Sequence, residues 1–390
     1  MAQAYIVAAV RTAGGRRNGR LLSWHPVDLA AAVLDAVTLR SGVDPAAIDD
    51  VIMGCVGQTG EQGLHVGRNA VLASSLPESV PAVTIDRQCA SSQQSIHFAA
   101  QAVMSGAQDI VIAAGVESMS RVPMGSTGGF YTDLRPGSAK SPRLEARYPG
   151  IAFSQFMGAE MVADKHGLSR EALDAYALES HRRAAAATRG GAFDKEILPL
   201  EVPVAEGGTE PHRHDEGIRY DASLEAMAAV KTLKEGGKIT AANASQICDG
   251  AAAVMIAGEA ALKTHGLTPL ARIHAMTVTG GDPVIMLEEP LFATDKALKR
   301  AGMSIGEIDL FEVNEAFASI PLAWLRHTGA DPAKLNVNGG AIALGHPLGA
   351  SGAKLMTTLV HALQARGKVY GLQTMCEGGG LANVTIIEAL

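Results

Sequence analysis

Two segments of the chain carry apolar residues at helical spacing, and each follows a short polar motif. In both segments the apolar positions recur at intervals of three and four residues. Such spacing gathers the side chains on one face of a helix. We therefore predict two helices with a buried face, one after Cys89 and one after His346. The positions are Ile96, Ala99, Ala100, Val103 and Met104 in the first segment, and Leu355, Met356, Leu359, Val360 and Leu363 in the second.

Short runs rich in β-branched and apolar residues lie beside these helical segments. We predict strands at 82–86, 109–113, 309–313 and 368–375. Strands that alternate with amphipathic helices are typical of an α/β fold.

The chain contains a weak internal repeat. Residues 41–53 resemble residues 301–313, and Ile48-Asp49 matches Ile308-Asp309 about 260 residues later. The segments that begin at 109 and 368 have nearly the same separation, and each follows a helical pattern that ends in glycine. Two copies of one α/β unit would explain the pattern. Because the matched segments are short, chance similarity of two helix–loop–strand patterns is the alternative.

A region of different composition separates the two copies. Residues 121–150 are rich in Gly, Pro, Ser and Arg, and residues 203–217 are polar and glycine-rich, whereas helical patterns lie near 158–189. Long loops in a compact enzyme often cover a site. We predict an N-terminal half at 1–118, completed by about 249–267, an inserted loop or cap domain at 119–248, and a C-terminal half at 268–390.

Composition excludes several classes of protein. The 390 residues are 47% hydrophobic and 19% charged, which indicates a globular chain with a large core. A net charge of -7 argues against a nucleic-acid partner, and no apolar run is long enough for a membrane span. The four cysteines are widely separated and the first residues lack a signal-peptide pattern, so we expect a reducing cytoplasm.

Cys89 is the first candidate for chemistry. It lies between a predicted strand and a predicted helix. The positive end of a helix dipole favours a thiolate, so this position predicts a lowered thiol pKa and a nucleophile. The alternative is that Cys89 is a small buried side chain, as most free cysteines are.

Three further residues lie next to glycines or at strand ends. His346 stands in a segment with many glycines, which suits close approach of a ligand to the backbone. Cys376 precedes three glycines, whose N–H groups are able to form an oxyanion hole. Asn314 follows a predicted strand. Its side chain is able to hold a water or a carbonyl oxygen, and the alternative is a helix cap.

His212 and His214 lie in a polar loop without a cysteine cluster, so we expect no metal site.

Several motifs resemble those of thiolases, and they occur in the order found in that family. They are 314–317 (NEAF), 345–352 (GHPLGASG) and 376–380 (CEGGG), after Cys89 at the expected place and the segment 241–253 that contains AANAS and DGAAA. The resemblance extends from Val10 to the C-terminus. It implies a five-layered αβαβα sandwich of two pseudo-repeated halves, each with a mixed five-stranded sheet, and an inserted loop domain.

The resemblance also implies roles for individual residues. Cys89 would attack the ketone of a 3-ketoacyl-CoA and become acylated, His346 would take its proton, and Cys376 would act as acid and base at the α-carbon. One oxyanion hole would consist of His346 and a water held by Asn314, and the other of the backbone N–H groups of Cys89 and Gly378. The implied activity is cleavage of 3-ketoacyl-CoA by CoA, or the reverse condensation.

Contacts to the substrate follow from the same resemblance. Arg219 would lie near the adenine nucleotide of CoA and Ser245 along the pantetheine, while Met157, Ala316 and Phe317 would line the tunnel. Coenzyme A would be a co-substrate, with no cofactor bound permanently. The family also implies a homodimer or homotetramer. The structural alternatives are a solvated arginine at 219 and an ordinary loop hydroxyl at 245.

Two departures from the family pattern bear on the substrate. Ser92 stands where many members have glycine, and Glu377 follows Cys376 where an apolar residue is usual. A charge beside Cys376 is expected to raise its pKa. These features are similar to bacterial degradative thiolases, some of which act on bulky substrates. A short-chain, biosynthetic acetoacetyl-CoA thiolase is the alternative.

The CEGGG segment argues against a decarboxylating ketoacyl synthase. A non-catalytic acyl-CoA-binding relative would be expected to lack Cys89, His346 or Cys376.

Overall fold

The computed structural model describes residues 2–129 and 139–390, and its N-terminal half is built on a mixed sheet of five strands. In spatial order the strands are β4 (Ala82–Ile85), β3 (Asp50–Gly54), β5 (Ile110–Ser118), β9 (Cys248–Gly258) and β1 (Ala4–Thr12). Strands β4, β3 and β5 run parallel to one another, whereas β9 runs antiparallel to both β5 and β1.

The C-terminal half repeats this order with four strands and a single bridge in place of the fifth strand. β11 (Leu310–Val313), β12 (Tyr370–Glu377), β13 (Leu381–Ala389) and β10 (Ala271–Gly280) lie side by side. The place of a fifth strand is taken by a single parallel bridge between Phe311 and Leu335, so the expectation of five full strands in this half is wrong. The two sheets join where Tyr5 and Ile6 of β1 pair with β10.

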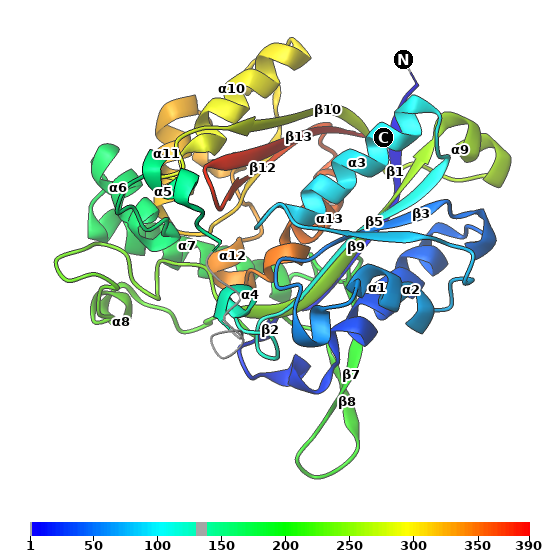
Figure 1. Cartoon of the computed structure of the whole chain (residues 1–390), viewed down its shortest axis with the longest axis horizontal. Helices are drawn as coiled ribbons and strands as arrows, with labels where there is room; N and C mark the ends of the chain where they lie inside the picture. Colours follow the sequence, from blue (N-terminus) through cyan, green and yellow to red (C-terminus); the bar gives the residue numbers. More distant parts are fainter. Residues whose placement is uncertain (1, 130–138) are drawn as a thin grey trace.

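Helices and sheets alternate in five layers. The central helices α3 (Ser91–Ser105) and α13 (Ser351–Arg366) lie next to each other between the two sheets (Figure 1). α1 (Pro26–Ser41) and α2 (Val66–Ala73) cover the N-terminal sheet. α10 (Glu289–Ala301) and α11 (Ser319–Thr328) cover the C-terminal sheet. The αβαβα architecture is therefore confirmed.

Matching hydrogen bonds relate the two halves. Oδ2 of Asp49 accepts from the backbone N–H groups of residues 109 and 110, at 2.6 and 3.0 Å. Oδ2 of Asp309 accepts from those of residues 369 and 370, at 3.0 Å each. Each aspartate therefore fixes the start of the neighbouring parallel strand. The structure therefore confirms the repeat. Residue 109 corresponds to residue 369, and not to residue 368 as the sequence comparison suggested.

The two central helices approach closely at their first turns. A side chain on Gly352 would lie 2.1 Å from the backbone N of Gln93, so only glycine fits there. Beside this contact, Oγ of Ser92 accepts a hydrogen bond of 2.9 Å from the N–H of Ala353. The unusual Ser92 thus links the N-terminal ends of α3 and α13.

The region between the halves contains short elements. They are α4 (Ser126–Gly129), α5 (Pro142–Arg147), α6 (Gln155–Lys165), α7 (Arg170–Arg189), β6 (Ile197–Leu198), the β7 (Leu200–Pro203)–β8 (Thr209–His212) hairpin and α8 (Leu224–Ala228). The hairpin projects from the body of the molecule (Figure 1). Residues 130–138 of the predicted loop lie outside the described part of the chain. β6 pairs with β1, so this region also contributes to the N-terminal sheet. The domain limits at 119–248 stay a prediction.

The remaining short elements connect these layers. They are β2 (Gly15–Arg16), α9 (Glu259–His265), α12 (Ala341–Leu344) and the 3-10 turns at Arg20–Ser23, Pro45–Ala47, Gly60–Gln62, Ile305–Glu307, Pro332–Lys334 and Leu348–Ala350.

Candidate active site

Cys89 lies in a tight turn between β4 and α3. The preceding residue, Gln88, has a φ of 47°, which is the left-handed region that non-glycine residues rarely adopt. Its N–H donates to Oδ1 of Asp86 at 2.6 Å, and Oγ of Ser91 donates to its carbonyl oxygen at 2.6 Å. Strain of this kind persists only where surrounding contacts enforce it. The turn holds the half-buried thiol at the edge of a cavity.

The thiol of Cys89 is held in its neutral form. Burial, followed by the negative charge of Glu377, raises the pKa of Cys89 to about 12. The expectation of a lowered pKa is therefore wrong. The position at the start of α3 supplies some stabilisation to a thiolate, but the loss of solvent and the neighbouring carboxyl outweigh it. Cys89 needs a base to become a nucleophile.

His346 has one ring nitrogen that is able to accept a proton. Its Nδ1 lies 2.5 Å from Oγ of Ser351, and that hydroxyl donates to the carbonyl oxygen of Pro347 at 2.9 Å. Because the Ser351 proton is directed to Pro347, we assign the ring proton to Nδ1, which leaves Nε2 as an acceptor. Burial, and then the charge of Lys354, lowers the pKa of His346 to about 3. The ring is thus neutral at physiological pH.

Asn314 lies against the free nitrogen of His346. Its Nδ2 is 3.4 Å from Nε2, whereas its Oδ1 has no hydrogen-bond partner among the described residues. Buried polar atoms without a partner are uncommon and point to a water or a ligand group. The amide is therefore available for the predicted water, although its part in an oxyanion hole stays a prediction.

Cys376 completes the group from the end of β12. Its thiol is buried, and burial together with the nearby Cys89 and Glu377 raises its pKa well above the ordinary value. The direction is the one expected from a charge beside it. Gly378 follows in the turn, where a side chain would lie 2.9 Å from Oε1 of Gln88. Cys89 and Gly378 line the same cavity, but their oxyanion-hole roles remain predictions.

Two cavities meet at this group. One, of about 440 Å³, contains Arg219, Ser245, Phe317 and His346 in its wall. The other, of about 790 Å³, is lined by Cys89 and Gly378 and by residues from the inserted region. Both cavities share Met124, Gln155 and Leu348, so they adjoin between His346 and Cys89.

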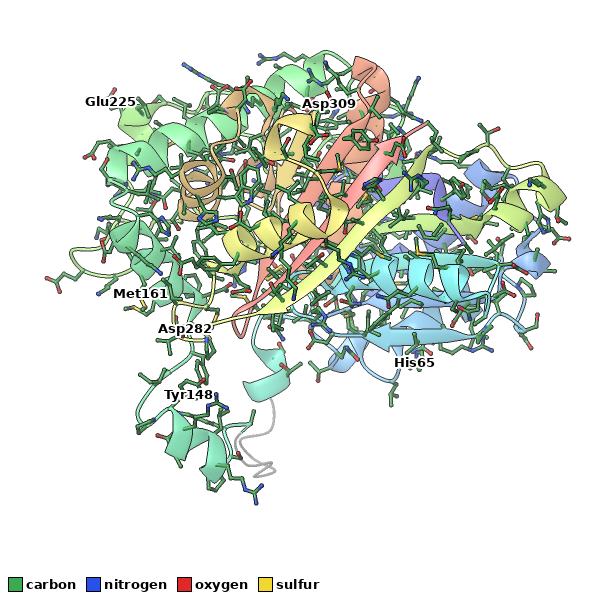
Figure 2. All side chains as sticks on the ribbon, turned by 90° about the horizontal axis from the view of Figure 1, so that it is seen from above. His65, Tyr148, Met161, Glu225, Asp282 and Asp309 are labelled. Atoms are coloured by element: carbon green, nitrogen blue, oxygen red, sulfur yellow. The ribbon has the colours of Figure 1, made fainter. Side chains whose placement is uncertain are left out.

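The larger cavity is mainly apolar. Its wall includes Leu144, Tyr148 and Phe153 of the inserted region and Pro283 and Met286 of the loop after β10. Figure 2 shows Tyr148 and Asp282 on the same side of the molecule, with the segment of Tyr148 projecting from the rest. The inserted region and the C-terminal half therefore enclose this cavity together.

Two of the predicted tunnel residues, Met157 and Ala316, are not among the residues that line these two cavities. Met157 is 41% exposed, and among the described residues it is its neighbours Gln155 and Phe156 that line the smaller cavity. Ala316 is buried, and its carbonyl oxygen accepts from the N–H of Ser245 at 2.9 Å. Ala316 thus supports the backbone of Ser245, and its place in the tunnel stays a prediction.

Sequence reasoning missed several residues of the site. Arg16 and Arg17 line the same cavity as Arg219, and the adjacent pair of basic residues was the available signal. Glu117 has no comparable signal. Its buried carboxylate accepts from the N–H groups of Val56, Gly57 and Gly349, at 2.9 Å each. It therefore anchors the loop that follows His346.

An ion cluster lies behind the same loop. Arg11 pairs with Glu196 at 2.5 Å and with Asp215 at 2.9 Å, and Lys354 lies 3.3 Å from Asp215. Lys354 also donates to the carbonyl oxygen of Leu344. Because all four charges are paired inside the protein, they fix the backbone before His346.

Neither a metal site nor a membrane helix is found in the described parts of the chain. Residues 2–129 and 139–390 contain no group of three or more His, Cys, Asp or Glu side chains suited to a metal ion. Among the helices described, none is long and apolar enough to span a bilayer.

Comparison with known proteins identifies the family. The model of the thiolase N-terminal domain matches residues 4–260, and that of the thiolase C-terminal domain matches residues 267–389. The chain is 52% identical to the steroid 3-ketoacyl-CoA thiolase FadA6 of Mycobacterium tuberculosis, over 100% of this chain and 95% of the relative. It is 42% identical to a 3-ketoacyl-CoA thiolase of Aeromonas hydrophila, over 100% of both.

A solved structure leads to the same result. The fold is similar to that of human mitochondrial 3-ketoacyl-CoA thiolase, with a TM-score of 0.91, 39% sequence identity and coverage of 100% of this chain and 99% of that one. The family models, the relatives and the fold agree over almost the whole length, and the chain therefore belongs to the thiolase family.

Proposed function

We propose that this protein is an acyltransferase that cleaves a 3-ketoacyl-CoA with CoA, giving acetyl-CoA and a shortened acyl-CoA through an acyl intermediate on Cys89. One observation carries the proposal. His346, whose Nε2 carries no proton, lines a cavity that also contains arginines, and Cys89 lines a larger, mainly apolar cavity that adjoins it. The buried thiol of Cys376 lies near Cys89. A CoA thioester requires such a pair of cavities, one for the nucleotide and one for the acyl group.

The geometry supports a two-step reaction. Nε2 of His346 takes the proton of Cys89 as the sulfur attacks the ketone carbonyl. The carbon–carbon bond then breaks, and the thiol of Cys376 protonates the departing enolate of acetyl-CoA. In the second step the Cys376 thiolate takes the proton of CoA, whose sulfur attacks the acyl thioester. The leaving Cys89 sulfur recovers the proton from His346, so the enzyme is restored.

The acyl group is inferred to be bulky. The cavity beside Cys89 has a volume of about 790 Å³, more than a two-carbon unit requires. A relative with 52% identity carries "steroid" in its name. These two facts favour degradation of a large 3-ketoacyl-CoA over short-chain acetoacetyl-CoA synthesis. Retention of Cys89, His346 and Cys376 argues against a non-catalytic acyl-CoA-binding protein.

The same proposal covers co-substrate, assembly and location. Coenzyme A serves as co-substrate, with Arg219, Arg16 and Arg17 near its phosphates and Ser245 along the pantetheine. The four cysteines are free, which suits a reducing cytoplasm. A homodimer or homotetramer is supported by an exposed sheet edge at β4, because unpaired edge strands favour association.

The decisive experiment traps the intermediate. The protein is incubated with acetyl-CoA, and peptide mass spectrometry locates the acetyl group. We expect it on Cys89, with Cys55 and Cys248 as internal controls that stay unmodified. A Cys376→Ala variant should acquire the same label but cleave 3-ketoacyl-CoA about 10²–10⁴-fold more slowly. A label on another cysteine, or normal cleavage by Cys376→Ala, would refute these roles.

Substrate size is tested separately. CoA-dependent cleavage is measured across 3-ketoacyl-CoA chain lengths and for an analogue with a sterol side chain. A higher kcat/KM for the large substrates is expected. Preference for acetoacetyl-CoA would favour the short-chain alternative.

A further inference from the structure

Glu117 of β5 joins the two halves of the molecule beside the catalytic groups. One carboxyl oxygen, Oε2, accepts from the backbone N–H of Val56 in the N-terminal half and from that of Gly349 in the C-terminal half, at 2.9 Å each. The other oxygen, Oε1, accepts from the N–H of Gly57 at 2.9 Å and from Nε2 of Gln62 at 2.8 Å. Both oxygens of this buried carboxyl therefore serve as acceptors.

Gly349 lies in the middle of the segment that holds the base. His346 stands three residues before it, and Ser351, whose hydroxyl lies 2.5 Å from Nδ1 of His346, stands two residues after it. The same hydroxyl donates to the carbonyl oxygen of Pro347 at 2.9 Å. The imidazole and its orienting serine are thus both carried by the backbone that Glu117 holds.

The backbone of Gly349 also packs where the first turn of α3 meets the N-terminal sheet. A side chain on Gly54, the last residue of β3, would lie 2.5 Å from the backbone N of Ser92 and 2.8 Å from the carbonyl oxygen of Gly349. A side chain on Gly115 of β5 would lie 2.3 Å from that carbonyl oxygen and 2.7 Å from Cβ of Ser92. The base segment and the turn that follows Cys89 therefore rest on the same two strands, with no space for a side chain.

The loops bound by Glu117 also contribute to the cavity walls. Val56 lines the larger cavity together with Cys89. Leu348, the residue before Gly349, lines both cavities. One carboxyl group therefore fixes two loops of the site that come from different halves of the chain.

We propose that Glu117 is a positioning residue: its carboxyl sets the distance between the base His346 and the nucleophile Cys89 by holding the loops of the two halves together. Proton transfer requires the donor and acceptor atoms within hydrogen-bond reach, so it depends on this distance. The role rests on the proposed function, because it needs Cys89 and His346 as the reacting pair.

Glu117→Gln tests the role at nearly constant volume. The amide keeps one acceptor oxygen but presents an NH2 group to the N–H donors of the other, so contacts to the loops are lost. Because a shift of about 1 Å is able to cost on the order of 10²-fold in rate, we expect kcat for CoA-dependent cleavage to fall on that order. KM for CoA should change little, since the wall of the smaller cavity, in the described part of the chain, contains none of the residues that Glu117 binds.

Glu160→Gln is the matched control. Glu160 of α6 is also a buried acid that accepts from backbone N–H groups, those of Lys238 and Ile239 at 2.9 Å, but it lies in the inserted region. This variant should lose stability in urea unfolding without a comparable fall in kcat. An equal fall in both variants, an unchanged kcat in Glu117→Gln, or a change in its KM as large as that in kcat would each overturn the proposal.

Glu117→Asp covers the case in which the glutamine variant does not fold. It keeps the carboxyl but is one methylene shorter, so it is too short to bind both loops, and a fall in kcat is again expected. Wild-type kcat in this variant would contradict the role. Labelling of Cys89 by acetyl-CoA separates the two proposals: the label should form more slowly in the Glu117 variants, whereas failure to label the wild-type protein would reject the proposed function itself.

Discussion

The hydroxyl of Ser351 lies 2.5 Å from Nδ1 of His346 and determines which nitrogen of the ring carries the proton. The serine stands at the first position of α13, and its own proton is directed to the carbonyl oxygen of Pro347. Ser351 thus controls where the proton sits on the ring of His346.

Replacement of Ser351 should therefore impair chemistry more than binding. In Ser351→Ala the imidazole loses its orienting partner, and we expect kcat/KM to fall on the order of 10–100-fold. The fall should appear mainly in kcat, measured in the cleavage assay. Thr357→Val is a matched control, because it removes a buried hydroxyl of the same helix whose bond goes to Ala353. A similar loss in both variants would indicate a general effect on α13.

Arg219 should contribute to binding but little to chemistry. It lines the cavity assigned to CoA, and its N–H donates to Nδ1 of His181 at 3.2 Å, so its backbone is fixed. The nucleotide is remote from the reacting carbons, and such uniform binding affects KM rather than kcat. We expect Arg219→Ala to raise KM for CoA substrates and to leave kcat nearly unchanged.

A truncated pantetheine thioester provides the control for Arg219. It lacks the nucleotide, so the wild-type protein and Arg219→Ala should process it alike. Equal slowing of the truncated and the full substrate would mean that Arg219 acts through structure. Arg17→Ala should behave like Arg219→Ala, because Arg17 lines the same cavity.

Buried histidines should make stability depend on pH. Burial lowers the pKa of His97 and of His346 to about 3, against about 6.5 in an unfolded chain. Between these values the unfolded state binds a proton that the folded state does not. The free energy of unfolding should therefore decrease as the pH falls below about 6.5, by about 1.4 kcal/mol per pH unit and histidine.

His97→Gln isolates one of these histidines. The amide is able to replace the contact of 2.8 Å between Nε2 of His97 and Oγ1 of Thr385. Urea unfolding at several pH values should give a slope smaller by about 1.4 kcal/mol per pH unit in the variant. An unchanged slope would show that His97 is protonated in the folded protein.

The exposed edge at β4 should be an assembly surface. Val83 on this strand and Phe98 on α3 are each 40% exposed. Light scattering should give a mass of at least two 40.4 kDa chains. Phe98→Glu should weaken the assembly, whereas Leu39→Glu, which alters a more exposed apolar residue on α1, should not. A monomeric wild-type protein at micromolar concentration would contradict the proposal.

Local patterns in the sequence were sufficient for the elements that carry the chemistry. The apolar spacing after Cys89 and His346 gave α3 and α13, and Ile48-Asp49 and Ile308-Asp309 revealed the repeat. These features depend on neighbours along the chain. The motifs that contain Cys89, His346 and Cys376 come from distant segments, and the structure brings them to one place.

Properties that depend on tertiary surroundings were not predictable in this way. The pKa of Cys89 is raised by burial and by Glu377 at the end of β12, and a helix-dipole argument includes neither effect. The position of Met157 depends on the direction in which α6 points its side chains. The reduced fifth strand of the C-terminal half arises because only Leu335 reaches the edge of the sheet.

The repeated architecture determines how the catalytic groups are divided between the two halves. Cys89 stands two residues before α3 in one copy, and Gly349 stands two residues before α13 in the other. In the proposed mechanism, one half supplies the nucleophile Cys89 and the other supplies the base His346. Neither half alone would therefore contain the complete catalytic set that the proposed reaction requires.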